Sequence, residues 1–170
     1  MLRFTPLAAL LILAAGTREA AAQRRAPGAS AGTEGSKVSI VARLDSKSYT
    51  SQVSGSCKHE PSASIYDVPA ALYMVQAQGG EGSEIQQLSL TLWRPKNGSA
   101  DQVSLSLQAG SSSSRIDVNP RNKAVGAATV ELKPVGSGGT FELKGKDAKG
   151  AALNLTISCP TFAAVVAEGG

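Results

Sequence analysis

The sequence has few of the residues that build long helices, metal sites and catalytic centres. Aromatic residues make up 4%, charged residues 18%, and a single histidine is present. Charged residues ordinarily form about a quarter of a globular protein. Their place is taken by glycine and serine, which suit short strands joined by tight turns. One histidine leaves a Cys/His zinc site short of ligands, so we expect neither a metal nor a cofactor.

The basic residues form no stripe and are not interleaved with aromatic residues. The formal net charge is +4, and the lysines and arginines are scattered singly along most of the chain. Recognition of nucleic acid would need a clustered basic surface. We therefore expect no nucleic-acid partner.

The sequence also lacks an apolar run long enough to span a membrane. The longest, Leu7 to Ala15, has nine residues, whereas a spanning helix needs about 20. A basic start precedes this run and Ala20-Ala21-Ala22 follows it, which is typical of a secretory signal peptide over residues 1–22. No cysteine lies directly after the run, so the lipobox is missing and we expect no lipid anchor. We expect a secreted protein, periplasmic or extracellular, without a transmembrane segment.

Only two cysteines are present, Cys57 and Cys159. In an exported protein such a pair predicts a disulfide. It would close a loop of about 100 residues and stabilise the fold by at most about 4–5 kcal/mol. Two free thiols or half of a metal site are the alternatives, which the scarcity of histidine disfavours.

The chain of 170 residues is long enough for one domain. Residues 23–36 have no apolar periodicity and are rich in glycine, alanine and serine, which predicts a disordered tether. We expect a folded domain over 37–163 and a flexible tail over 164–170.

Apolar residues alternate with polar ones throughout the expected domain. The clearest run has Leu88, Leu90 and Leu92 alternating with Gln87, Ser89 and Thr91, and a second has Val103, Leu105 and Leu107 in the same phase. Turn signals such as Asn97-Gly98 and Asn119-Pro120 separate these runs. The pattern predicts an all-β fold, an antiparallel β-sandwich of immunoglobulin-like arrangement with about seven to nine strands.

The few aromatic residues are the best candidates for a binding surface. Trp93 is out of phase with the leucines before it, while Tyr66 and Tyr73 flank the turn at Asp67-Val68-Pro69. If Trp93 and Tyr73 share the outer face of one sheet, they would form an apolar platform for a ligand. We therefore predict ligand binding at Trp93, Tyr73 and Tyr66. The alternative is that Trp93 caps one end of the core.

Catalytic patterns are absent from the sequence. His59 lies beside Cys57, and no Gly-x-Ser-x-Gly nucleophile motif accompanies it. Asp45, Asp67 and Asp101 fall at strand ends or turns, where aspartate serves the backbone. We predict no catalytic residue, with a secreted hydrolase using His59 and a turn carboxylate as the alternative.

Three segments carry a resemblance to a known family. They are Val53-Ser54-Gly55-Ser56-Cys57, Thr140-Phe141-Glu142-Leu143-Lys144-Gly145 and Leu155-Thr156-Ile157-Ser158-Cys159. Together with the small-residue tether they resemble the mycobacterial nineteen-kilodalton lipoprotein antigen family, although the family's lipobox cysteine is missing here. The resemblance implies a small exported β-protein with one disulfide and a surface or adhesive role without enzymatic activity.

These observations predict a non-catalytic exported binding protein with a glycan or protein partner at an envelope surface. A structural envelope protein without a discrete ligand remains a further alternative. Asn97-Gly98-Ser99 and Asn154-Leu155-Thr156 match the N-glycosylation pattern, which matters only in a host that glycosylates its secreted proteins.

Overall fold

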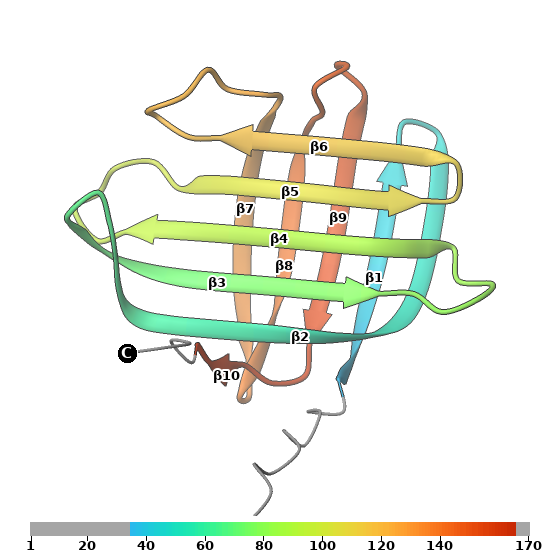
Figure 1. The fold of residues 1–170 in the computed structure, drawn as a ribbon, viewed down its shortest axis with the longest axis horizontal. Coiled ribbons are helices and arrows are strands. Elements are labelled where there is room, and N and C mark those ends of the chain that lie inside the picture. The colour runs from blue at the N-terminus through green and yellow to red at the C-terminus, as the bar shows by residue number, and fades with distance from the viewer. Residues whose placement is uncertain (1–34, 166–170) are drawn as a thin grey trace, which may run out of the picture. The chain divides into compact units, whose positions relative to one another are not determined.

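The computed structural model describes residues 35–165, and the regular structure in this range consists of strands alone (Figure 1). The predicted all-β class is confirmed. The expected signal peptide at 1–22, nearly all of the tether at 23–36 and most of the tail at 164–170 lie outside the described residues.

Ten strands follow one another within residues 35–165. They are β1 (Ser36–Leu44), β2 (Lys47–Ile65), β3 (Val68–Gln78), β4 (Ile85–Pro95), β5 (Gln102–Ala109), β6 (Ser112–Val118), β7 (Ala127–Val135), β8 (Gly138–Lys146), β9 (Ala152–Cys159) and β10 (Ala163–Ala164). β1 starts one residue before the expected domain boundary.

The strands belong to one continuous sheet folded into two layers. Its order is β6-β5-β4-β3-β2-β1-β9-β8-β7, all neighbours are antiparallel, and β10 adds a short parallel pairing to β2. In Figure 1, β2 to β6 cross the front, and β1, β9, β8 and β7 run behind them at a steep angle. We call these the front and back layers.

β2 joins the two layers. Its first half pairs with β1 and its second half, from Ser54 onward, pairs with β3. The packed layers of the expected sandwich are therefore halves of one bent sheet. Their order is a run of hairpins that brings β9 beside β1, which differs from the Greek-key connections of immunoglobulin domains. The alternation of side chains determines which face is buried, but it does not determine which strands are neighbours.

The edges of the sheet come close to each other at β6 and β7. Asp117, near the end of β6, forms an isolated antiparallel bridge with Val125, just before β7. On β4, the Arg94 Nη2 atom donates a hydrogen bond to the Val130 carbonyl of β7 at 3.3 Å. The sheet is thus nearly closed on itself, and it leaves little unpaired edge exposed.

The core lies between the two layers and follows the predicted alternation. Leu90 and Leu105 are each 1% exposed, and they pair directly across β4 and β5. The back layer contributes its own inward residues to the same cluster, including Ile40, Phe141, Leu143, Leu155 and Ile157.

The predicted disulfide between Cys57 and Cys159 is confirmed. The two residues are 102 positions apart in the sequence, with their Cα atoms separated by 6.1 Å. The bond joins β2 to the end of β9 and so ties the second strand of the fold to the last long one.

Candidate ligand-binding pocket

The β2–β3 hairpin ends in an unusually strained turn. Tyr66 and Asp67 have φ angles of 53° and 65° and form a two-residue connection between the paired Ile65 and Val68. Positive φ at both positions is what a type I′ turn requires. Aspartate tolerates this conformation, but a tyrosine in it is uncommon and costs free energy. Contacts elsewhere must therefore hold Tyr66 in place.

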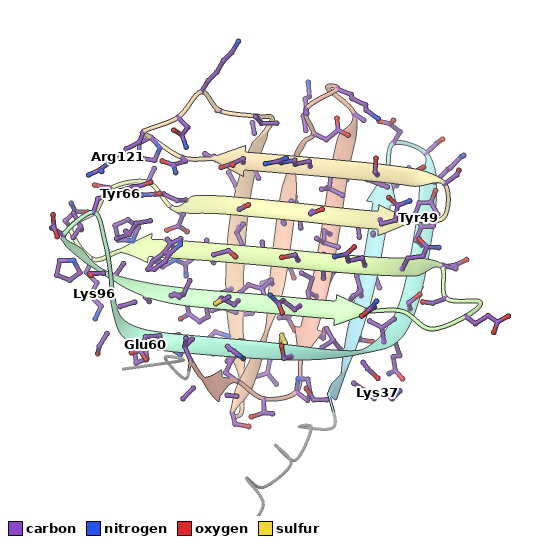
Figure 2. All side chains as sticks on the ribbon, viewed as in Figure 1. Lys37, Tyr49, Glu60, Tyr66, Lys96 and Arg121 are labelled. Carbon is purple, nitrogen blue, oxygen red and sulfur yellow. A yellow bond between two sulfur atoms is a disulfide. The ribbon has the colours of Figure 1, made fainter. Side chains whose placement is uncertain are left out.

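Those contacts come from the segment that follows β6. The Asn119 Nδ2 atom donates a hydrogen bond to Tyr66 Oη at 2.8 Å, and Tyr66 Oη lies 3.2 Å from Asn119 Oδ1. The guanidinium of Arg121 lies 3.6 Å from the centre of the Tyr66 ring, a cation–π contact. Figure 2 shows Tyr66 and Arg121 close to each other at one end of the front layer. We call Tyr66, Asn119 and Arg121 the clasp.

A pocket of about 470 Å³ lies beside the clasp, between the hairpin, the β4–β5 connection and the segment after β6. Most of its wall is aliphatic or proline. The lining residues are Ile65, Tyr66, Val68, Pro95, Ser99, Ala100, Asp101, Gln102, Val118, Asn119, Pro120 and Ala124. A concave, mostly apolar site with a few polar groups is the usual form of a small-molecule site.

Two polar side chains in the wall have different roles. Asp101 accepts hydrogen bonds from Arg94 Nε and Nη2 at 3.1 and 3.0 Å, so its charge is already paired. Gln102 is 7% exposed, and its Oε1 atom is buried without a hydrogen-bond partner among the described residues. A buried carbonyl oxygen without a partner costs about 1–3 kcal/mol. Gln102 therefore belongs to the mostly apolar wall of the pocket, and its carbonyl oxygen is buried in that wall without a partner.

Tyr66 and Trp93 lie close to this pocket, but only Tyr66 lines it. Trp93 is half-buried, pairs directly with Gln102 across β4 and β5, and lies beside Leu72 of β3. Its neighbour Leu92 is fully buried, so Trp93 is on the outer face of the front layer, as its phase predicts.

Tyr73 lies on the other face, and the prediction of a platform shared with Trp93 is wrong. It pairs with the buried Leu92 and packs against the core. Its ring stacks on that of His59 with centroids 4.2 Å apart, and Phe141 and Phe162 meet it edge-on at 5.9 and 5.8 Å. Both faces of β3 carry apolar residues. Tyr73 shares one face of the strand with Val75 and Ala77, and because these two residues are buried in the core, Tyr73 points inward as well.

His59 belongs to this internal aromatic cluster. Within residues 35–165 its Nε2 atom is buried without a hydrogen-bond partner, and its ring contacts those of Tyr73 and Phe162. The turn carboxylates have backbone or ion-pair roles: Asp45 accepts the amide of Ala152 at 2.9 Å, and Asp101 pairs with Arg94. A general base needs a nucleophile or an orienting carboxylate within hydrogen-bond reach, and His59 has neither among the contacts of the described residues.

Three residues of the site, Gln102, Asn119 and Arg121, are not predicted as binding residues from the sequence. Asn119 was recognised only as part of a turn signal. Arg121 carries no local pattern, since its partner Tyr66 is far away in the chain. The signal in the sequence is the turn composition at Asp67-Val68-Pro69 and at Asn119-Pro120, but nothing in the sequence indicates that the two turns meet. The structure places the first turn one residue earlier, at Tyr66 and Asp67.

No protein-family model, curated protein or solved structure matches the chain. Within residues 35–165, no helix is long and apolar enough to cross a membrane. No group of three or more histidine, cysteine, aspartate or glutamate residues that could hold a metal ion occurs in that same range.

Proposed function

We propose that this chain is an exported, non-catalytic binding protein that holds a small, largely apolar molecule in the pocket beside the clasp. The observation that carries the proposal is the combination of a pocket of about 470 Å³ with the buried, unpartnered Oε1 of Gln102. A ligand with an apolar body and one hydroxyl or N–H group would fill the pocket and satisfy this oxygen.

The size of the pocket fits such a ligand. Small-molecule sites occupy about 300–1,000 Å³ and bury most of the ligand surface. Each Å² of apolar surface removed from water contributes about 25 cal/mol, so the aliphatic wall supplies most of the affinity. Gln102 then selects among apolar molecules, because a ligand without a donor would leave its carbonyl oxygen unsatisfied.

Two features support export of this protein, the sequence pattern over residues 1–22 and the disulfide. The pattern over residues 1–22 is typical of a signal peptide. The Cys57–Cys159 bond suits an oxidising compartment outside the cytoplasm. A secreted location, periplasmic or extracellular, accounts for both features.

Binding fits this pocket better than hydrolysis does. The polar side chains considered for catalysis either form an ion pair already or cannot accept a proton as a general base. Asp101 is held by Arg94, and Gln102 does not titrate. His59 packs among aromatic rings, and it contributes nothing to this pocket.

A titration with the fluorescent probe N-phenylnaphthylamine tests the pocket directly. The probe has two aromatic ring systems and one N–H donor, so we expect its emission to rise and saturate when wild-type protein is added. Ala124 is exposed at the pocket wall, so Ala124→Phe should fold normally and abolish the rise. Thr156→Ala, on the outer side of the back layer, is the matched control and should leave it intact. Equal binding by Ala124→Phe and wild type would refute the proposal.

A further inference from the structure

The outer face of the front layer is rich in uncharged polar side chains. On the central strands β3, β4 and β5, every outward side chain is neutral, and the amides and hydroxyls among them are Gln76, Gln78, Gln87, Ser89, Thr91, Gln102, Ser104, Ser106 and Gln108. The charged outward residues, such as Lys58 on β2 and Arg115 on β6, stay on the flanking strands.

The outer face of the back layer differs in its charge. Lys133 of β7 and Glu142 of β8 form an ion pair at 2.7 Å. The hydrogen bond that Lys133 Nζ donates to Glu142 raises the pKa of Lys133. Glu131 and Lys144 lie on the same face. The outer face of the back layer is therefore charged, whereas the central strands of the front layer have only neutral outward side chains.

A shallow hollow of about 540 Å³ opens on the front face where β2, β3 and β4 run side by side. Its polar lining is two rows of directly paired residues, Ser54–Gln78–Gln87 and Ser56–Gln76–Ser89. Side chains paired in this way are about 4.5–5.5 Å apart. Each glutamine carboxamide offers both a donor and an acceptor, so the hollow presents a dense array of both kinds.

Gly55 lies between the two serines at the bottom of this hollow. A Cβ atom added there would lie 2.6 Å from the Gln76 carbonyl and 3.0 Å from Val38 Cγ2. The close approach of the β2 and β3 backbones at this bend therefore requires glycine.

We propose that this hollow binds an uncharged glycan. Neighbouring hydroxyls of a sugar ring pair well with carboxamides, which donate and accept side by side, and a neutral ligand matches a face whose central strands carry no charge. None of the residues that line the hollow is charged, and the nearest cations on this face, Lys37 beside Ser54 and Lys58 beyond Ser56, lie at its border. The hollow shares no lining residue with the pocket beside the clasp, so binding in the hollow does not depend on that pocket.

Trp93 extends the proposed site along β4. It lies four residues beyond Ser89 on the same face, about 14 Å away at about 3.4 Å per residue. Its half-buried ring lies between Leu72 and Gln102 and can stack on the apolar face of a sugar. A disaccharide fills the hollow alone, whereas a chain of several sugars reaches Trp93 as well.

Calorimetric titration with neutral oligosaccharides tests this arrangement. The probes are the disaccharides and hexasaccharides of the cellulose, chitin, starch and mannan series. We expect at least one series to bind, with its hexasaccharide at least tenfold tighter than its disaccharide. Gln87→Ala with Gln76→Ala should weaken both lengths at least tenfold. Trp93→Ala should weaken only the hexasaccharide. Thr156→Ala on the back layer is the control and should change neither.

Several results would overturn the proposal. One is the absence of binding by every series at millimolar concentration. Another is binding that survives the double glutamine variant while circular dichroism shows that variant to be folded. Tighter binding of an acidic chain, such as hexagalacturonate, would also overturn it, and so would a protein partner that occupies the same face. Binding of N-phenylnaphthylamine is measured separately, so the pocket and the glycan site can fail independently.

Discussion

Individual leucines of the front layer carry much of the stability of the fold. Leu90 and Leu105 are paired and 1% exposed, so Leu90→Ala or Leu105→Ala should lower the free energy of unfolding by about 2–5 kcal/mol. Ser104, exposed on the outer face, is the control, and Ser104→Ala should stay within about 0.5 kcal/mol. Urea denaturation measures both. Similar losses for the leucine and serine variants would show that the faces are assigned wrongly.

At the residue scale, the sequence predicts burial well where one face is clearly apolar and poorly where both are. Leu88 and Leu90 alternate with polar residues, so their direction is unambiguous. In β3 both faces carry apolar residues, and alternation alone cannot say whether Tyr73 or Leu72 points inward. The pairing of Tyr73 with the buried Leu92 shows that Tyr73 points inward. That pairing joins two different strands, so the alternation within β3 cannot predict it.

At the element scale, the clasp should determine how tightly the β2–β3 hairpin is held. Tyr66→Phe removes the hydroxyl that forms hydrogen bonds with Asn119. The turn at Tyr66 and Asp67 then loses an interaction that compensates for its unfavourable backbone conformation. We expect the amides of the hairpin to exchange hydrogen several-fold faster, as measured by NMR. Such local openings are governed by local contacts.

Tyr49→Phe is the matched control for this prediction. The Tyr49 hydroxyl lies 3.3 Å from Ser112 Oγ, and Figure 2 shows Tyr49 at the other end of the front layer from Tyr66. Its loss should leave the exchange of the β2–β3 hairpin unchanged. An equal effect of the two variants on the hairpin would mean that the clasp does not hold it.

The full length of β2 could not be predicted from its pattern. The alternation of Tyr49, Ser51, Val53, Gly55 and Cys57 is weak and predicts a strand that ends near Cys57, whereas β2 continues to Ile65. It passes from one layer to the other, and its register with β3 shifts between Glu60 and Ala63. A bend and a bulge both interrupt the alternation of faces, so the periodicity on which the prediction depends is lost.

For the whole molecule, the disulfide should be the largest single contribution to stability. Closing a loop of 102 residues restricts the unfolded chain, and replacing both Cys57 and Cys159 by alanine should cost up to about 4–5 kcal/mol. Thermal unfolding with and without reductant measures this. A reduced protein that melts at the same temperature as the oxidised one would contradict the prediction.

The order of strands lies beyond what the sequence could indicate. The hairpins between successive strands follow from short turns, but the pairing of β1 with β9 joins segments more than 100 residues apart. The clasp and its pocket depend on the same long-range folding, since they bring Tyr66 to Asn119. The resemblance to the nineteen-kilodalton antigen family stays a prediction.

The most direct test of the central claim is to locate a bound ligand on the protein by NMR. With N-phenylnaphthylamine added to isotope-labelled protein, we expect chemical-shift changes concentrated at the residues that line the pocket, including Tyr66 and Ala100, and in the side-chain amide of Gln102. Val41 and Thr156 on the back layer should not change. Shifts spread over the back layer, or none at the Gln102 side chain at saturation, would contradict the claim that this pocket is the binding site.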